Sequence, residues 1–285
     1  MLIDFHTHVF PEKIAARSIV ALTAGIHNIQ GADYGNGAPL TFREATVQAL
    51  FDTMPASGVT QSICLPIATK PSQTAHINDF AAEVTRFGNA HGKSLLSFGT
   101  LHPENDDFAE ILERLADAGF RGIKLHLQFQ LHDIDSPEVI RILKKATRLG
   151  LLVIFHAGAD IGLPPPVFTT PEKISHVLGE VDGRMLIAAH MGGWQEWDDV
   201  EKYLVGTDIN FDTAFVRDFL PAAQAKRIIQ THGADKVLFG SDSPWEDPAD
   251  TLTYLQSLGL TDAELDLITH KNAQRLLGDA AASDA

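Results

Sequence analysis

The amino-acid sequence predicts an α/β protein folded as a (β/α)8 TIM barrel. Eight short, mostly apolar runs alternate with amphipathic helical stretches along the chain. Most runs are nearly continuous in apolar residues, as in Leu151–Phe155, which is expected of parallel strands buried on both faces. The length of 285 residues is ordinary for one such barrel. Together these three observations favour a closed barrel over an open sheet.

The expected strands are spread over the whole chain. They lie at Leu2–Thr7, Thr60–Leu65, Leu95–Leu101, Gly122–His126, Leu151–His156, Met185–His190, Asp208–Asp212 and Lys236–Ser241. In a barrel of parallel strands, all carboxyl ends meet at one mouth, where the following loops build the active site.

The expected helices are marked by apolar spacing and by a glycine after each. The clearest follows the fourth strand, where Ser136 can cap the helix, Pro137 fits its first turn and Gly150 ends it. Its apolar residues fall at helical spacing, namely Val139, Ile142, Leu143, Ala146 and Leu149. Further helices are expected at Thr41–Ser57, Ala75–His91, Asp106–Ala118 and Pro221–His232.

No low-complexity linker divides the chain, so residues 1–285 are expected to form a single domain. Two segments resemble inserted loops: Gly25–Leu40 is rich in Gly and Asn, and Gly158–Thr170 contains three consecutive prolines. Both follow strands, which places them at the mouth where substrate specificity is set.

Composition narrows the class of protein and its surroundings. The chain is 45% hydrophobic and 21% charged, an ordinary globular composition, and its formal net charge is −15. Such a charge repels phosphate backbones, so nucleic acid is not an expected partner. The start of the chain shows no signal peptide and no apolar run is long enough for a membrane helix. With Cys64 as its single cysteine, the protein is expected to be cytoplasmic.

Five side chains with metal-binding chemistry follow the expected strands. His6 and His8 end the first strand and, two residues apart, face the same side. His156, His190 and Asp242 end the fifth, sixth and eighth. A lone histidine after a strand is commonly a core residue, but five such groups at one barrel mouth favour a metal site.

With these motifs in place, the sequence resembles the amidohydrolase superfamily. More narrowly, it is similar to the amidohydrolase-related branch that includes aminocarboxymuconate semialdehyde and resorcylate-type decarboxylases. The segment Lys271–Gly278 is similar to the closing helix of that family. The resemblance covers essentially the whole chain, and it implies a TIM barrel of the metal-dependent hydrolase type.

The resemblance implies a divalent metal held by His6, His8, His156 and Asp242. Zinc is the first choice, with manganese or another divalent ion as the alternative, because three imidazoles and one carboxylate suit a borderline ion and leave a place for water. Asp242 would accept and return a proton, and His190 would polarise the substrate or bind a second ion.

Lys124 leaves the number of metal ions open. It lies on the fourth strand, on the same side as His126. In binuclear relatives a carboxylated lysine at this strand bridges two metals, and the histidines after the fifth and sixth strands, here His156 and His190, bind the second. The alternatives are an unmodified lysine that binds substrate or that neutralises an acidic mouth.

Further candidates for substrate binding follow other strands. His126 would line the pocket, and His102 after the third strand is a candidate of the same kind. Lys70 and Arg217 are candidate anchors for a substrate carboxylate. Trp194, Trp197 and Trp245 either form an aromatic wall or pack against the barrel rim, and Asp160 either holds a histidine or faces solvent.

Three functions remain open. In the first, which we favour, a metal-bound hydroxide attacks an amide, ester or lactone carbonyl of a small, cyclic or carboxylated substrate, with Asp242 and His190 assisting. In the second, the same residues serve a non-oxidative decarboxylase of an unsaturated or aromatic acid. The third is a barrel that binds a metal or ligand without catalysis. The expected partner is a small-molecule substrate, and the resemblance alone implies a homodimer.

Overall fold

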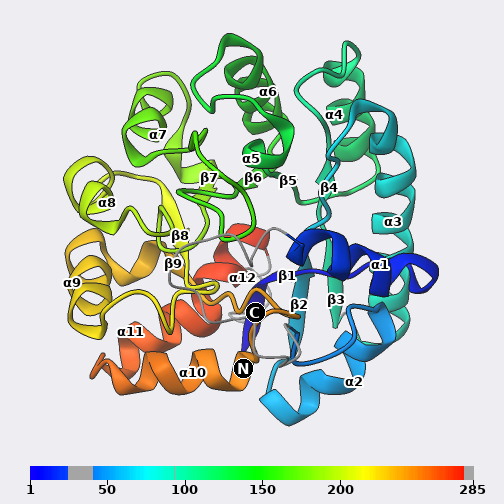
Figure 1. The fold of residues 1–285 in the computed structure, drawn as a ribbon. Helices are drawn as coiled ribbons and strands as arrows, with labels where there is room; N and C mark the ends of the chain where they lie inside the picture. Colours follow the sequence, from blue (N-terminus) through cyan, green and yellow to red (C-terminus); the bar gives the residue numbers. More distant parts are fainter. Residues whose placement is uncertain (25–40, 93, 279–285) are drawn as a thin grey trace.

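Parallel strands form the centre of the molecule, surrounded by helices (Figure 1). The structure is a computed structural model that describes residues 1–24, 41–92 and 94–278. Three strands form one array in the described residues: β1 (Ile3–Thr7), β2 (Gln61–Cys64) and β3 (Leu95–Ser97). Six form the other: β4 (Gly99–Thr100), β5 (Gly122–Leu125), β6 (Leu152–Phe155), β7 (Leu186–Ala188), β8 (Asn210–Asp212) and β9 (Val237–Leu238).

Backbone hydrogen bonds close these arrays into the predicted TIM barrel. The third expected strand is divided at Phe98, whose N–H donates to the Cys64 carbonyl oxygen at 2.9 Å. On the other side, the N–H of Phe5 donates to the Phe239 carbonyl at 2.8 Å. Beyond β9 the N–H of Asp242 donates to the His6 carbonyl at 2.8 Å, so the first and last strands are neighbours. The eight expected strand positions are therefore confirmed, with the third split in two.

The helices cover the outside of the barrel (Figure 1). Those described are α1 (Glu12–Thr23), α2 (Val47–Ser57), α3 (Thr74–Ala90), α4 (Phe108–Asp117), α5 (Leu127–Gln130), α6 (Pro137–Arg148), α7 (Pro171–Leu178), α8 (Trp197–Tyr203), α9 (Ala222–His232), α10 (Pro248–Ser257), α11 (Asp262–Asp266) and α12 (Asn272–Leu277). As predicted, the Ser136 hydroxyl caps α6 by accepting from the Val139 N–H at 3.4 Å.

The helix predicted at Thr41–Ser57 is wrong at its start. Residues 41–46 are not helical, and α2 begins at Val47 because Thr46 is extended and its hydroxyl accepts from the Ala49 N–H. The predicted loop Gly25–Leu40 lies outside the described residues. The segment 158–170 is a loop, as predicted, apart from an isolated bridge at Gly158.

Two apolar layers hold the barrel together. The inner layer includes Ile3, Phe5, Ile63, Ile154 and Ile187, all at most 3% exposed. The outer layer lies between strands and helices and contains alternate strand residues, for example Val153 and Phe155 of β6. Burying one such side chain contributes about 2 kcal/mol. Because alternate residues on a strand face the barrel interior, the residues that follow each strand are placed at its mouth.

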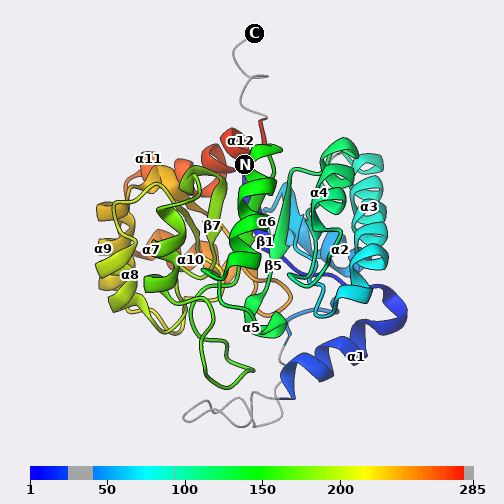
Figure 2. The same ribbon diagram turned by 90° about the horizontal axis from the view of Figure 1, so that it is seen from above.

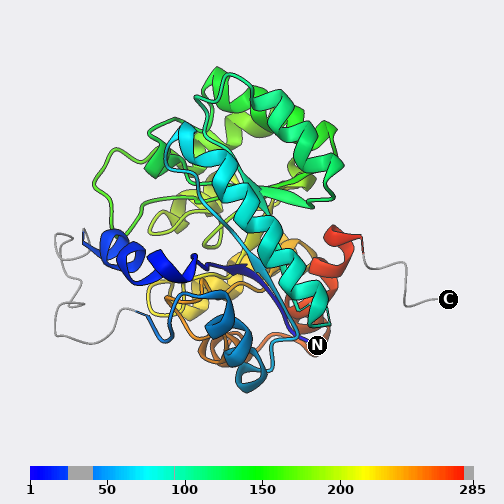
Figure 3. The ribbon, with the colours of Figure 1, turned by 90° about the vertical axis from the view of Figure 1, so that its right-hand side faces the viewer.

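The two ends of the barrel differ. Figure 2 shows α1 and α5 at the end opposite α12 and the N-terminus, and Figure 3 shows α3 running between these ends. The strands run away from the N-terminal end, so α1 lies at the mouth where the strands finish. No helix among the described residues has the length and apolar character needed to cross a membrane.

Candidate metal centre and cavity

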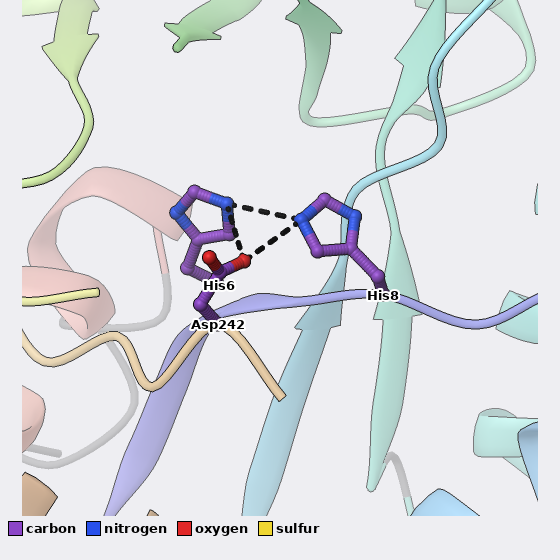
Figure 4. Close-up of side chains that lie close together, drawn as sticks. All are labelled: His6, His8 and Asp242. Carbon is purple, nitrogen blue, oxygen red and sulfur yellow. Dashed lines mark hydrogen bonds and ion pairs between the residues drawn. The ribbon is translucent and has the colours of Figure 1, made fainter. Parts of the chain in front are cut away.

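Three predicted metal ligands meet at the mouth of the barrel (Figure 4). His6 Nε2 lies 3.2 Å from His8 Nε2. Asp242 Oδ1 lies 3.4 Å from His6 Nε2 and 3.1 Å from His8 Nε2. One ligand atom from each of the three residues therefore lies within 4.8 Å of the other two. This compact group of two imidazoles and one carboxylate has the composition of a zinc site.

Hydrogen bonds on the far side of each ring fix which nitrogen carries a proton. His6 Nδ1 donates to Asp212 Oδ2 at 2.8 Å, and His8 Nδ1 donates to the Leu65 carbonyl at 2.8 Å. In a neutral imidazole the other nitrogen, here Nε2, is then a lone-pair acceptor. Two lone pairs and a carboxylate oxygen thus face one another, an arrangement that a cation between them would stabilise.

The electrostatics of this group agree with that assignment. Burial and the nearby Lys124 ammonium hold the pKa of His6 well below its usual range, so its ring is neutral. Burial opposes ionisation of Asp242, but the neighbouring His6 and His8 hold the pKa of its carboxyl below the usual range. The group therefore presents a neutral His6 ring beside a charged Asp242 carboxylate, and both are protonation states that suit binding of a divalent ion.

Two more histidine nitrogens with free lone pairs, one in His190 and one in His156, lie beside the first group. His190 Nδ1 donates to the Ala214 carbonyl at 2.9 Å, and His156 Nε2 donates to the Ala159 carbonyl at 2.9 Å. The remaining nitrogens, His190 Nε2 and His156 Nδ1, face each other at 3.0 Å. The rings of His6 and His190 have centroids 5.2 Å apart, so this pair adjoins the first group.

His156, predicted as a ligand together with His6, His8 and Asp242, lies in a different group from those three residues. One ligand atom from each of His126, His156 and Asp160 lies within 4.8 Å of the other two. His126 Nε2 is 3.2 Å from Asp160 Oδ2, and the rings of His126 and His156 stack with centroids 4.3 Å apart. Asp160, for which the sequence left two roles open, thus contacts a histidine.

Lys124 is buried between these groups. Its side chain is 1% exposed, and Nζ lies 3.2 Å from His6 Nε2. Burial lowers the pKa of Lys124 to about 8, although Asp212, Asp242 and Asp160 oppose this change. A lysine whose pKa is lowered in this way has an appreciable neutral fraction near neutral pH, so its amine is available for chemistry there.

Two buried aspartates that were not predicted from the sequence hold the candidate ligands in position. Asp212 accepts His6 Nδ1–H with Oδ2, while its Oδ1 accepts the His190 N–H at 2.8 Å and the Ala214 N–H at 3.1 Å. Asp4 Oδ1 accepts the N–H groups of His6, at 3.2 Å, and Ser241, at 3.0 Å. The sequence carried two signals for these roles. Asp4 lies two residues before His6, and Asp212 ends the seventh expected strand.

The backbone is strained at both predicted catalytic residues. His190 has φ 59° and Asp242 has φ 65°, in the left-handed region that non-glycine residues seldom adopt. Ile187 faces the inner layer, so regular alternation of side chains along β7 would point His190 outward. The left-handed φ of His190 breaks this alternation. Gly240 is also required, since a Cβ there would lie 2.8 Å from His6 Cβ.

The loop after β7 yields a prediction about pH. Glu196 Oε2 is buried with no hydrogen-bond partner among the described residues, and burial, with Asp199 nearby, raises the pKa of Glu196 to about 7. Between about pH 4.5 and 7 the folded form keeps a proton that the unfolded form loses, so rising pH lowers the free energy of unfolding. We expect Glu196→Gln to be more stable than the parent by about 1 kcal/mol at pH 8, after allowance for partial exposure.

Denaturant unfolding at about pH 4 and pH 8 measures this effect. At about pH 4 the two proteins should be equally stable. The exposed Glu83→Gln serves as the matched control and should show no such pH-dependent gain. A Glu196→Gln advantage that is equal at both pH values would contradict the prediction.

Several predicted substrate residues do not reach the mouth. His102 does not line the cavity, and its Nδ1 accepts the Glu104 N–H at 3.1 Å. Lys70 is exposed and lies off the cavity. Arg217 is engaged by Glu246 at 2.7 Å and by Asp218 at 3.1 Å. The folded positions of these three side chains give them no contact with the cavity wall.

The tryptophans divide between the two predicted roles. Trp194 and Trp245 line the cavity. Trp197 instead packs below it, where its Nε1–H donates to the His190 carbonyl at 3.1 Å. The Trp194 N–H donates to the Ala157 carbonyl, and the Trp194 carbonyl accepts the Ala159 N–H. Gly158 permits this close approach, because a Cβ there would lie 2.3 Å from Trp194 N.

A cavity of about 830 Å³ lies above the candidate metal centre. Its floor is polar and carries both histidine groups, Lys124 and Asp242. Its walls come from α1, the start of α3 and the loop after β6. This volume lies at the upper end of the usual range for small-molecule sites, so the cavity has room for a substrate larger than one ring.

Comparison with known proteins places these observations in a family. The sequence model of the Amidohydrolase family matches residues 3–278. No curated protein matches the chain. Solved structures that match it include 5-carboxyvanillate decarboxylase from Sphingomonas paucimobilis, with a TM-score of 0.68, 16% identity and coverage of 97% of this chain and 98% of that one.

Two further structures extend the comparison. A probable 2-pyrone-4,6-dicarboxylic acid hydrolase from Acinetobacter baumannii has a TM-score of 0.63 and 19% identity, covering 97% of this chain and 99% of that one. A 5-carboxyvanillate decarboxylase from Novosphingobium aromaticivorans, with bound manganese, has a TM-score of 0.72 and 14% identity, covering 98% of this chain and 97% of that one. At these identities the likeness shows a common fold.

Proposed function

The chain belongs to the amidohydrolase family, whose members are metal-dependent enzymes, and from this premise we propose that it is a hydrolase acting on an amide, ester or lactone carbonyl. The observation that carries the proposal is the convergence of His6 Nε2, His8 Nε2 and Asp242 Oδ1, three acceptors that face one another on the cavity floor. Such a set would hold a divalent ion while the cavity admits a substrate.

The donor set fits zinc, and we propose that one zinc ion is held by His6, His8, Asp242 and the Nδ1 of His156. When bound, such an ion lowers the pKa of water and polarises a carbonyl group. Manganese is the alternative ion, because a decarboxylase of similar structure contains bound manganese.

The residues of the chain would supply the remaining chemistry. Asp242, which is ionised and lines the cavity, would accept a proton and return it to the leaving group. His190, which lines the cavity and whose Nε2 lies 3.0 Å from His156 Nδ1, would orient the substrate carbonyl. The backbone strain at both residues is the kind that clusters at functional sites.

A decarboxylase is the second candidate because Lys124 meets one of its requirements. Loss of CO2 needs a cation that holds the substrate carboxylate near the metal, and Lys124 Nζ lies 3.2 Å from His6 Nε2. It also needs an apolar path for the departing CO2, and the cavity walls are mostly apolar. The same residues would then assist protonation of carbon.

Parallel assays separate these two reactions. The zinc-loaded protein is given hydroxybenzoates, with CO2 release measured, and a panel of lactones, esters and amides, with hydrolysis measured. We expect hydrolysis of at least one member of the panel and no CO2 release. Release of CO2 without hydrolysis would replace the hydrolase by the decarboxylase. Inactivity on every substrate with metal fully bound would support the non-catalytic barrel.

The number of ions tests Lys124 directly. Elemental analysis should find about one zinc per chain, and Lys124→Ala should leave that number unchanged while lowering activity. About two ions per chain, of which Lys124→Ala removes one or both, would show a carboxylated bridging lysine with His190 on the second ion. Less than about 0.1 ion per chain after zinc loading would remove the metal mechanism. The homodimer stays a prediction.

A further inference from the structure

The walls of the cavity differ sharply from its floor. Above the metal centre the lining side chains are mainly aromatic and aliphatic, with Phe10, Phe80, Phe129, Trp194, Phe215 and Trp245 contributed by separate parts of the chain. One face of α1 adds Ile14, Ala21 and Leu22. A surface of this kind favours apolar ligands, because binding removes their apolar area from water.

Cations are nearly absent from this surface. Among the described residues, Lys124 is the one lysine or arginine on the cavity wall, and it lies at the floor, next to His6. Arg217 is paired with Glu246 and Asp218, and Lys70 is exposed away from the cavity. Arg43 is also off the cavity and donates to the Ser243 hydroxyl at 2.9 Å.

An anionic group on the body of a ligand would therefore lose its water without gaining a lysine or arginine as a partner among the described residues. Removing a carboxylate from water into apolar surroundings is strongly unfavourable unless a cation or several donors replace the water. The formal net charge of −15 on the chain also repels an anionic ligand. A neutral ligand of the same shape has no charge to desolvate and is not repelled by the net negative charge of the protein.

We propose that the substrate has an uncharged, apolar body, aryl or alkyl, which fills the cavity between α1, α3 and the loop after β6. Its strongly polar part is the reacting ester, lactone or amide group at the floor. This inference rests on the proposed hydrolase and narrows its substrate class: a carboxylate placed away from the reacting group is excluded from good substrates.

Two matched fluorescent probes test the cavity without turnover. N-phenyl-1-naphthylamine is neutral, and 8-anilinonaphthalene-1-sulfonate has the same ring system with one negative charge. We expect the zinc-loaded protein to bind the neutral probe with one-to-one stoichiometry and at least about tenfold more tightly than the anionic one. Equal or tighter binding of the anionic probe would overturn the proposal.

A charge introduced on α1 shows whether the probes report this cavity. Ile14 lines it and is 39% exposed, so Ile14→Lys is compatible with folding. Val20 lies on the same helix, is 68% exposed and is absent from the wall, so Val20→Lys is the matched control. Ile14→Lys should improve binding of the anionic probe by about fivefold or more and weaken the neutral one, whereas Val20→Lys should change neither. Equal effects of the two variants would contradict the proposal.

A pair of esters then tests the substrate class in the reaction itself. 4-Nitrophenyl hexanoate and the 4-nitrophenyl half ester of adipic acid have chains of equal length, and the second ends in a carboxylate. We expect kcat/KM to favour the neutral ester by about 100-fold or more. A smaller preference, with measurable turnover of both, would reject the apolar substrate class. Absence of turnover for both, with the expected probe binding, would instead count against the hydrolase and leave the cavity assignment standing.

Discussion

Replacement of Asp242 by asparagine is expected to leave the barrel folded and to lower kcat by about 10³-fold or more. The amide keeps an oxygen that can face the metal centre, but it carries no charge and cannot accept the proton that hydrolysis requires. The fold should survive because Asp242 has φ 65° and asparagine adopts this left-handed conformation more readily than most residues. The measurement is kcat at saturating zinc and substrate, with circular dichroism as the test of folding.

The control for this variant is Asp235→Asn, an exposed change in the turn before β9. It should retain parental kcat. A kcat within about tenfold of the parent for Asp242→Asn, with zinc bound, would contradict the role of Asp242 as proton acceptor. Loss of zinc from the variant at all accessible concentrations would instead identify Asp242 as a ligand whose charge the ion requires, and kcat would have to be compared in the manganese form.

The sequence was informative about the mouth of the barrel for a physical reason. Parallel strands must finish at one end, so residues that follow apolar runs are brought together whatever the details of packing. His6, His8, His156, His190 and Asp242 were found in this way, and all five line the cavity. Lys124 and His126, assigned to one side of their strand, line it as well.

The same rule was less reliable where the chain turns soon after a strand. His102 follows its strand as closely as the ligands follow theirs, yet its ring contacts His132 and the Glu104 N–H instead of the cavity. Long side chains were harder still, because the partners of Arg217 are set by a non-local contact with Glu246. Strand position alone does not specify such contacts.

Other features depend on contacts that have no local signature. Helix α1 supplies one wall of the cavity and was not among the named helices, although Pro11 and the spacing of Ile14, Ser18 and Leu22 were available signals. The left-handed backbone of His190 and Asp242 could not be read from residue type, since neither is glycine. Asp212 looked like an ordinary strand residue until the fold placed it between His6 and His190.

Asp212 gives the second prediction with a large expected effect. The two carboxylate oxygens of Asp212 have different hydrogen-bond partners: Oδ2 accepts His6 Nδ1–H, and Oδ1 accepts the backbone N–H groups of His190 and Ala214. Asparagine has a single carbonyl oxygen, so Asp212→Asn can satisfy the His6 ring or the backbone pair, but not both. Loss of such an orienting partner typically weakens metal binding by 10- to 100-fold, and we expect a zinc Kd raised by about that factor.

Competition with a chelator of known affinity measures that Kd, and the exposed Asp208→Asn, before the same strand β8, is the control. Because Asp212 acts through His6 and does not touch the substrate, added zinc should restore most of kcat to Asp212→Asn. Asp242→Asn should stay inactive under the same conditions, since its missing group takes part in the reaction itself. A zinc Kd within about twofold of the parent would show that the Asp212–His6 hydrogen bond does not set the metal affinity. Restoration of kcat by zinc in one variant and not in the other would separate the residue that positions a ligand from the residue that moves the proton.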